Sequence, residues 1–255
     1  MVQSRTNEAH ESKQPVEPSW KGFYRVSGVL AVITGIMGFI FMIGGLNLYS
    51  SGYPSTPTAY LQLISQHQGS AYRLWSLWDI GDFLGLAPTV AAFLILRHYN
   101  KTLALLGSLV VGFYLFYDIS VTELNSLTLV SLSQGYANAT TDALRASYVA
   151  AATYGYAALP LQTVLSFGVG SVGWLLWCVP MARSAFGRPT AIFGAIVNVI
   201  GIIGAAAPVV TSNILGLCQL LAPPLIGLWI IIVGLKLYRH SGQFASLDGT
   251  TLPVT

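Results

Sequence analysis

The sequence predicts an all-α protein built as a bundle of six transmembrane helices, with both termini in the cytoplasm. Its composition points to a membrane: hydrophobic residues make up 54% of the 255 residues and charged residues only 8%, whereas a typical soluble domain has about 25% charged residues. The apolar residues gather in six long runs, and most Lys and Arg residues fall on one side of these runs. So few charges argue against a soluble enzyme and against a nucleic-acid-binding protein.

Each of the six apolar runs is long enough to cross the membrane as a helix, which takes about 20 residues for a hydrocarbon core of about 30 Å. Helices are favoured over a β-barrel because the runs are continuous and do not alternate with polar residues. The uncharged stretch 189–235 is too long for one span, and its polar residues 211–213 predict a turn between two. The predicted spans are 26–48, 75–96, 103–124, 159–179, 191–210 and 215–235.

The segments around these spans have a polar composition. Residues 1–22 contain Pro and no apolar run, so they are predicted to be a disordered cytoplasmic tail, without a cleavable signal peptide. Residues 23–239 form the transmembrane domain, and 240–255 a second cytoplasmic tail. The large outer loops are 49–74 and 125–158. Within them, 58–66 after Pro57 and 142–158 before Pro160 are expected to be helical.

The distribution of positive charge predicts the orientation. Of the 12 Lys and Arg residues, only Arg73 and Arg145 fall in the outer loops. Positive charge is retained on the cytoplasmic face, so the side that carries the remainder, with both termini, is expected to be cytoplasmic. The remaining ten are Arg5, Lys13, Lys21, Arg25, Arg97, Lys101, Arg183, Arg188, Lys236 and Arg239.

Two of the predicted spans are too short to cross the bilayer unless they include acidic residues. Only 14 uncharged residues separate Asp82 from Arg97, and 16 separate Lys101 from Asp118. At 1.5 Å per residue these stretches cover about 21 and about 24 Å, too little to cross about 30 Å of hydrocarbon. The second span must therefore include Asp82, with Asp79 one turn away, and the third must include Asp118 at a similar depth.

These residues predict an acidic pocket in the outer half of the bundle. On the third span Tyr114, Asp118 and Thr122 are spaced as a polar stripe, and two Gln residues lie near the outer ends of the fourth and sixth spans. Glu123 is expected at the surface. The candidate binding residues are Asp79, Asp82, Asp118, Tyr114, Thr122, Gln162 and Gln219.

No Lys or Arg within the spans can pair with these acids, so they are expected to be protonated, hydrated or bound to a cation. In the alternative interpretation, Asp79 is interfacial, and Asp82 and Asp118 bond to Tyr, Trp or Ser partners that fix the helix register. Gly81 and Gly85 form a GxxxG that would permit a close helix approach.

The sequence contains no pattern typical of a metal site, a haem site or a known class of enzyme. All four His residues lie in tails or loops, which leaves no ligands in the bundle for haem or zinc. No nucleotide-binding, metalloprotease or serine-hydrolase motif is present. We therefore expect no catalytic residues, no metal and no cofactor. Cys178 and Cys218 belong to opposite halves of the membrane, which excludes a disulfide between them.

A series of short motifs follows the predicted helices. It comprises residues 24–28 before the first span, 72–74 leading to 78–80, 94–97 followed by 103–106, 173–180 and 229–237. In this order they resemble a family of bacterial and archaeal multi-pass proteins, the domain-of-unknown-function family 4386. The resemblance covers about residues 20–239 and implies six helices in a prokaryotic plasma membrane. It implies no activity and no catalytic residues.

Three functions are compatible with these patterns. The first is binding or transport of a proton, a cation or a small basic solute through the outer acidic pocket. The second is a structural or sensory subunit that packs against a membrane-protein partner or a second copy of itself. The third is a membrane enzyme that uses two carboxyl groups as acid and base on a lipid. The lipid bilayer is the one partner common to all three.

Overall fold

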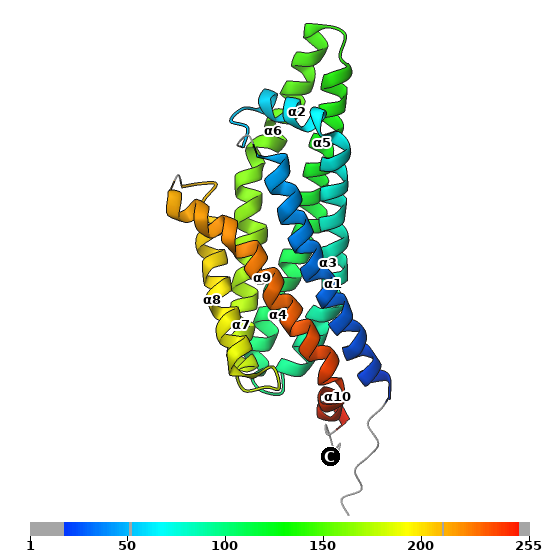
Figure 1. The fold of residues 1–255 in the computed structure, drawn as a ribbon, viewed down its shortest axis with the longest axis vertical. Coiled ribbons are helices and arrows are strands. Elements are labelled where there is room, and N and C mark those ends of the chain that lie inside the picture. Colours follow the sequence, from blue (N-terminus) through cyan, green and yellow to red (C-terminus); the bar gives the residue numbers. More distant parts are fainter. Residues whose placement is uncertain (1–17, 51–52, 211, 250–255) are drawn as a thin grey trace, which may run out of the picture.

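The computed structural model describes residues 18–50, 53–210 and 212–249, and every regular element in this part of the chain is a helix. Six helices are long and apolar enough to cross a membrane, which confirms the predicted all-α bundle and the number of spans. The spans are formed by α1 (Pro18–Leu48), α3 (Gln68–Leu96), α4 with α5, α6 with α7, α8 (Gly187–Ala205) and α9 (Asn213–Arg239) (Figure 1).

The third and fourth spans are continuous helices that contain a π-helical turn. In the third, η1 (Asp118–Thr122) joins α4 (Lys101–Tyr117) to α5 (Glu123–Asn138). In the fourth, η2 (Val164–Gly168) joins α6 (Asp142–Thr163) to α7 (Val169–Met181). These helices have 38 and 40 residues, or roughly 57 and 60 Å at 1.5 Å per residue, so they extend well beyond a 30 Å hydrocarbon core.

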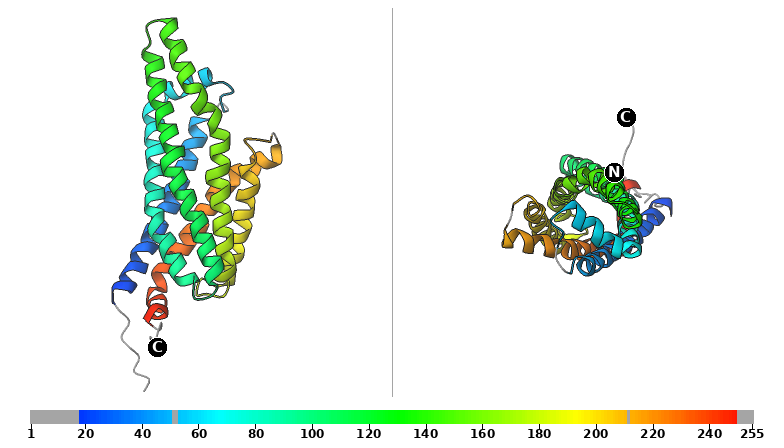
Figure 2. Two further views of the ribbon diagram at one scale, coloured as in Figure 1. Left: turned by 180° about the vertical axis from the view of Figure 1, so that it is seen from behind. Right: turned by 90° about the horizontal axis from the view of Figure 1, so that it is seen from above.

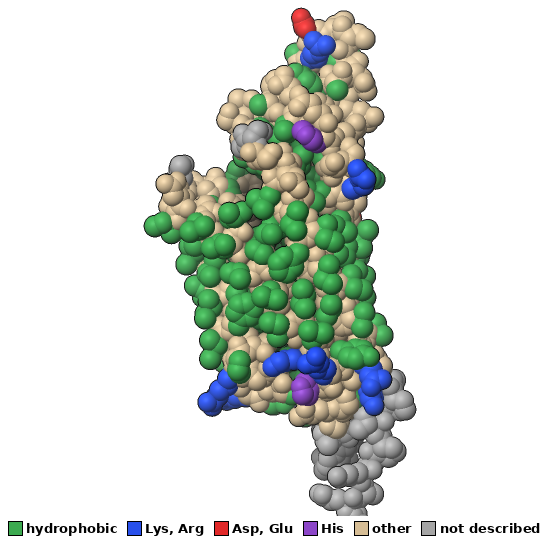
Figure 3. Space-filling view, viewed as in Figure 1, with side chains coloured by type: hydrophobic (Ala, Val, Ile, Leu, Met, Phe, Trp, Pro, Cys, Tyr) green, Lys and Arg blue, Asp and Glu red, His purple; other side chains and the backbone are tan. Residues whose placement is uncertain are grey.

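The six spans form a closed ring in chain order. Each span packs against the next, through α1 with α3, α3 with α4, α4 with α7, α7 with α8 and α8 with α9, and the first span, α1, makes its most extensive contact with the last, α9. The view from above shows these helices around a common centre (Figure 2). The face seen in Figure 3 carries a broad band of hydrophobic side chains, and exposed hydrophobic residues occur on all six spans, as expected for a surface that faces lipid.

Glycines allow α1 and α9 to approach closely. A Cβ atom on Gly28 would lie 2.6 Å from the carbonyl oxygen of Gly234, and one on Gly35 would lie 2.6 Å from that of Gly227. The predicted close approach at Gly81 and Gly85 is wrong, since a Cβ there would meet no neighbour nearer than 3.7 Å. Close backbone contact therefore occurs between α1 and α9, where the ring closes, and at Gly107 and Gly173 in the third and fourth spans, but not beside Asp82.

Both described ends of the chain lie at the same end of the bundle (Figure 1). Lys and Arg side chains border the hydrophobic band there (Figure 3), and we call this the basic end. Within the segments predicted as tails, α1 already begins at Pro18, and α10 (Ser241–Gly249) packs Phe244 against Tyr24 and Phe186. Residues 1–17 and 250–255 lie outside the described residues.

The opposite end carries a helical hairpin, formed by α5 and α6, that projects beyond the other spans (Figure 2), and we call it the hairpin end. Helix α6 covers the stretch 142–158 that was predicted to be helical, but the prediction of a loop over 125–138 is wrong, because α5 is helical there. Leu129 and Val130 of α5 are buried in a hydrophobic cluster with residues of α2 (Pro57–Gln66) and α6. This packing explains why the polar segment is ordered.

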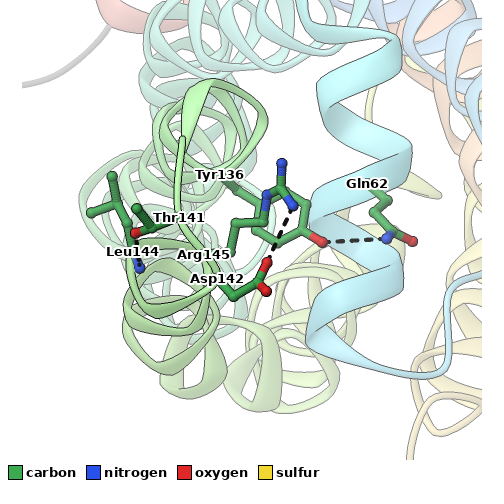
Figure 4. Close-up of polar contacts among 6 residues, drawn as sticks. All are labelled: Gln62, Tyr136, Thr141, Asp142, Leu144 and Arg145. Atoms are coloured by element: carbon green, nitrogen blue, oxygen red, sulfur yellow. Dashed lines mark hydrogen bonds and ion pairs between the residues drawn. The ribbon is translucent and has the colours of Figure 1, made fainter.

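Polar contacts hold the hairpin and α2 together (Figure 4). The side chain of Gln62 on α2 donates a 3.3 Å hydrogen bond to the hydroxyl of Tyr136 on α5. At the tip, the Thr141 hydroxyl caps α6 by accepting a hydrogen bond from the Leu144 N–H. Helix α2 begins at Pro57, as predicted for the stretch 58–66, and covers one side of the hairpin.

Candidate functional site

Two aspartates, one on the second span and one on the third, each accept a hydrogen bond from an aromatic side chain of the other span. The Tyr114 hydroxyl on α4 donates a 3.0 Å hydrogen bond to Asp82 Oδ1 on α3. The Trp78 indole on α3 donates a 2.8 Å hydrogen bond to Asp118 Oδ2 at the end of α4. Trp78 and Asp82 are four residues apart, as are Tyr114 and Asp118, so each helix supplies one donor and one acceptor on the same face. These are the Tyr and Trp partners of the alternative interpretation.

Each aspartate also has a second oxygen that receives no such bond. Asp82 Oδ2 and Asp118 Oδ1 are buried without a hydrogen-bond donor, and their side chains are 5% and 2% exposed. The two side chains lie close enough to interact directly. A single proton placed between them would give the pair the donor that it lacks, because a protonated carboxyl group donates a hydrogen bond.

Glu123 joins this cluster, and its predicted surface position is wrong. The residue is 1% exposed, and neither carboxyl oxygen has a hydrogen-bond partner. The reason is η1: the backbone N–H of Glu123 bonds to the carbonyl of Asp118, five residues earlier. In a regular α-helix, residues five apart would diverge by about 140°. The π-turn instead places Glu123 on the face of Asp118, and the two side chains interact electrostatically.

Asp79 lies at the edge of the cluster. Its side chain is half-buried, and its Oδ1 atom is buried without a partner. It interacts electrostatically with Asp118 and Glu123. Four carboxyl groups from the second and third spans thus share one region of the bundle, and we call them the carboxyl cluster. Two cavities adjoin this cluster, and no Lys or Arg among the described residues lines them.

The two π-turns face each other across this region. The Thr122 hydroxyl in η1 lies 3.2 Å from the Ser166 hydroxyl in η2, and Ser166 also bonds to the Gln162 carbonyl. The Asn125 amide donates to the Gln162 side-chain oxygen at 2.9 Å and to the Gly155 carbonyl at 3.0 Å. Polar groups of the fourth span, in η2 and in the α6 segment before it, are therefore held by those of the third span. Single π-turns inside α-helices occur frequently at functional sites.

A cavity of about 270 Å³ opens beside the cluster on the side of the hairpin end, and we call it the hairpin-side cavity. Its polar wall comes from the third, fourth and sixth spans, and its aromatic wall includes Phe41, Trp75 and Trp78. Tyr49, Tyr53 and Tyr60 line it nearer to α2. The polar lining residues are Asp118, Thr122, Glu123, Ser126, Gln162, Thr163, Ser166 and Gln219.

A second cavity, of about 100 Å³, lies inside the ring, and we call it the central cavity. It is mostly apolar, with Trp174 and Trp229 among its walls, and Asp82 and Tyr114 reach it from α3 and α4. Trp78, Phe167 and Pro223 line both cavities. Since Asp82 borders one cavity and Asp118 the other, the interacting aspartates stand at the boundary between them.

The predicted site residues divide between the two cavities. Asp118, Thr122, Gln162 and Gln219 line the hairpin-side cavity, Asp82 and Tyr114 line the central one, and Asp79 lines neither. Three further residues were not predicted as part of the site, and the spacing of Trp78 four residues before Asp82 was the one available signal. They are Trp78, Glu123 and Ser166.

The donor set does not suit a metal ion. Among the described residues, no group of three or more His, Cys, Asp and Glu side chains is arranged to hold one. Tyr114 and Trp78 already occupy one oxygen of Asp82 and of Asp118, and aromatic rings form much of the adjoining walls. The carboxyl groups can hold protons or pair with a positively charged group.

Comparison with known proteins gave no match to a family model, a curated protein or a solved structure. Membership of the family that the sequence resembles therefore stays a prediction, and the functional argument depends on the geometry of the carboxyl cluster.

Proposed function

We propose that this multi-pass protein takes up a proton or a cation at the carboxyl cluster, and so binds or transports a cation or a small basic solute through the hairpin-side cavity. The observation that carries the proposal is Glu123, a buried acid on the wall of a cavity with both carboxyl oxygens unpartnered. A buried charge is costly unless it is paired. A cationic ligand or a proton would supply the partner that the chain itself does not provide.

The orientation follows from the positive-inside rule. Eight Lys and Arg residues in the described part of the chain come from the segments at the basic end, so we place this end in the cytoplasm. The hairpin-side cavity then opens toward the outside of a plasma membrane. Glu123 is about 33 Å along its helix from Lys101, near the outer edge of the hydrocarbon core, where a solute from the external medium could reach it.

The boundary position of the aspartate pair supports transport over simple binding. A proton shared by Asp82 and Asp118 would reduce the negative charge of the pair from two to one, and a cation bound beside Asp118 would compete with that proton. Uptake of a cation from the hairpin side would then release a proton, and Asp82 connects this exchange to the central cavity. Proton and cation would compete for the same carboxyl groups.

The test compares Asp118→Asn and Glu123→Gln with Asp142→Asn, a control whose acid is fully exposed at the hairpin tip. Melting temperatures of the purified proteins in lipid nanodiscs are measured from about pH 4 to about pH 9, the range in which carboxyl groups in proteins titrate. We expect the two cluster variants to change the shape of the profile and the control to follow the wild type. Superimposable profiles for all four proteins would refute the proposal.

A further inference from the structure

We infer that the ligand of the hairpin-side cavity is an organic monocation, an amine or quaternary ammonium with a small apolar body, and not a metal ion. This inference rests on the proposed function and names the class of solute. It depends on three features of the cavity: the unpartnered carboxyl oxygens, the aromatic wall next to them, and an unpartnered indole N–H group.

The carboxyl oxygens supply the negative charge. Both oxygens of Glu123 and the Oδ1 atom of Asp118 are buried and have no donor, and both residues line the cavity. Glu123 is only 1% exposed, so its carboxyl group is removed from bulk solvent. A positive group between the two side chains would pair with both.

The aromatic wall supplies the second feature. The Phe41 ring lies 4.4 Å from the Trp78 ring and 5.1 Å from the Trp75 ring, measured between centroids, and all three residues line the cavity. Aromatic faces attract organic cations through their π electrons, and clustered rings are the usual receptor for quaternary ammonium groups. Rings offer nothing comparable to a hydrated metal ion, which requires about six to eight oxygens when it is Ca²⁺.

The cavity also has a free hydrogen-bond donor. The Trp75 indole Nε1 is buried without a partner, so an oxygen acceptor on the ligand could satisfy it. The volume of about 270 Å³ is close to the lower end of small-molecule pockets, about 300 to 1,000 Å³. A compact cation with a short oxygen-bearing arm fits these properties.

The test uses a pair of probes with the same shape and different charge. Acetylcholine carries a permanent quaternary ammonium and a carbonyl oxygen, and 3,3-dimethylbutyl acetate replaces the charged nitrogen by carbon. Binding to the wild-type protein in nanodiscs of zwitterionic lipid is measured by calorimetry at neutral pH. We expect acetylcholine to bind saturably and the neutral probe to bind about tenfold more weakly. The neutral probe can form neither the ion pair nor the cation–π contact.

Two variants connect binding to the cavity. Glu123→Gln removes the unpaired charge, and Phe41→Leu removes one ring without touching a carboxyl group. Each should weaken acetylcholine binding about tenfold, with Asp142→Asn equal to the wild type. Phe41→Leu should also leave the pH profile of the melting temperature unchanged, which shows that the variant is folded and that its carboxyl cluster is intact.

The outcomes separate this inference from the proposed function. Equal binding of the two probes, or Ca²⁺ or Na⁺ binding without acetylcholine binding, would overturn the inference. If the pH profile still depends on Asp118 and Glu123, the carboxyl cluster keeps its proposed role with another ligand. If the profile does not depend on them, both proposals fall together.

Discussion

The Trp78 indole and the Asp118 carboxyl group are joined by a 2.8 Å hydrogen bond across the contact between the second and third spans. The bond connects a rigid aromatic ring to the first residue of a π-turn, so it fixes both the helix register and one oxygen of the acid. Because the acceptor belongs to a buried carboxyl group, its loss should cost more than that of an ordinary hydrogen bond.

Replacement of Trp78 by Phe should therefore destabilise the protein by about 1 to 3 kcal/mol, since a buried oxygen of Asp118 would lose its donor. Thermal unfolding in detergent measures the change. Trp177→Phe is the matched control, because Trp177 donates its indole bond to a hydroxyl group, that of Ser108. Equal losses in the two variants would mean that the carboxyl acceptor makes no special contribution.

Glu123 should reduce the stability of the ligand-free protein. Its side chain is buried and neither oxygen is bonded, so Glu123→Met, which keeps the length of the side chain and removes its polar atoms, should stabilise the fold by about 1 to 3 kcal/mol. The measurement is the melting temperature at neutral pH without added solute. A lower melting temperature for Glu123→Met would indicate a structural role for the acid.

The contact between α1 and α9 should not tolerate a side chain at Gly28. A Cβ atom there would lie 2.6 Å from the Gly234 carbonyl oxygen, whereas one at Gly38 on the same helix would meet nothing within 4 Å. Gly28→Ala should cost about 1 to 3 kcal/mol, because two backbones would have to move apart, while Gly38→Ala should be neutral or stabilising because alanine favours the helix. The two melting temperatures give the comparison directly.

Tyr60 should make the protein sensitive to alkali. Burial raises the pKa of its phenol well above the ordinary value of 10.0, and the nearby Tyr49 and Tyr53 add to the effect. A phenol with a raised pKa in the folded state contributes stability that is fully present below about pH 10 and is lost as the pH rises above it, when the unfolded chain ionises first. The melting temperature should therefore fall above about pH 10.

The variant Tyr60→Phe should flatten that alkaline decline. Tyr154→Phe is the control, since its ring is 85% exposed, and it should follow the wild-type curve. The same alkaline slope in Tyr60→Phe and in the wild type would assign the loss of stability to other groups.

The spacing of charges allowed part of the site to be predicted. The number of uncharged residues that separate them from Arg97 and Lys101 predicted that Asp82 and Asp118 belong to the second and third spans, and both are buried inside the bundle. Glu123 could not, because its inward position depends on a π-turn, and a helix of regular pitch would direct it away from Asp118.

The helical hairpin was only partly predictable for a related reason. Residues 125–138 are too polar to be recognised as a span, but they continue the third helix because α2 and α6 cover them. A span is recognised from an apolar run about as long as the bilayer is thick, and this segment has no such run. Tertiary contacts that join residues far apart in the chain decide its structure.

Ring closure has a consequence for biogenesis. Helix α9 leaves the ribosome after the other five spans and packs against α1, so it supplies the missing wall of the central cavity, through Pro223, Ile226 and Trp229. Until it inserts, the glycine face of α1 has no helix to cover it and meets lipid or the translocation machinery. Truncation before residue 213 should therefore leave an open arc of five helices in which the central cavity lacks one wall.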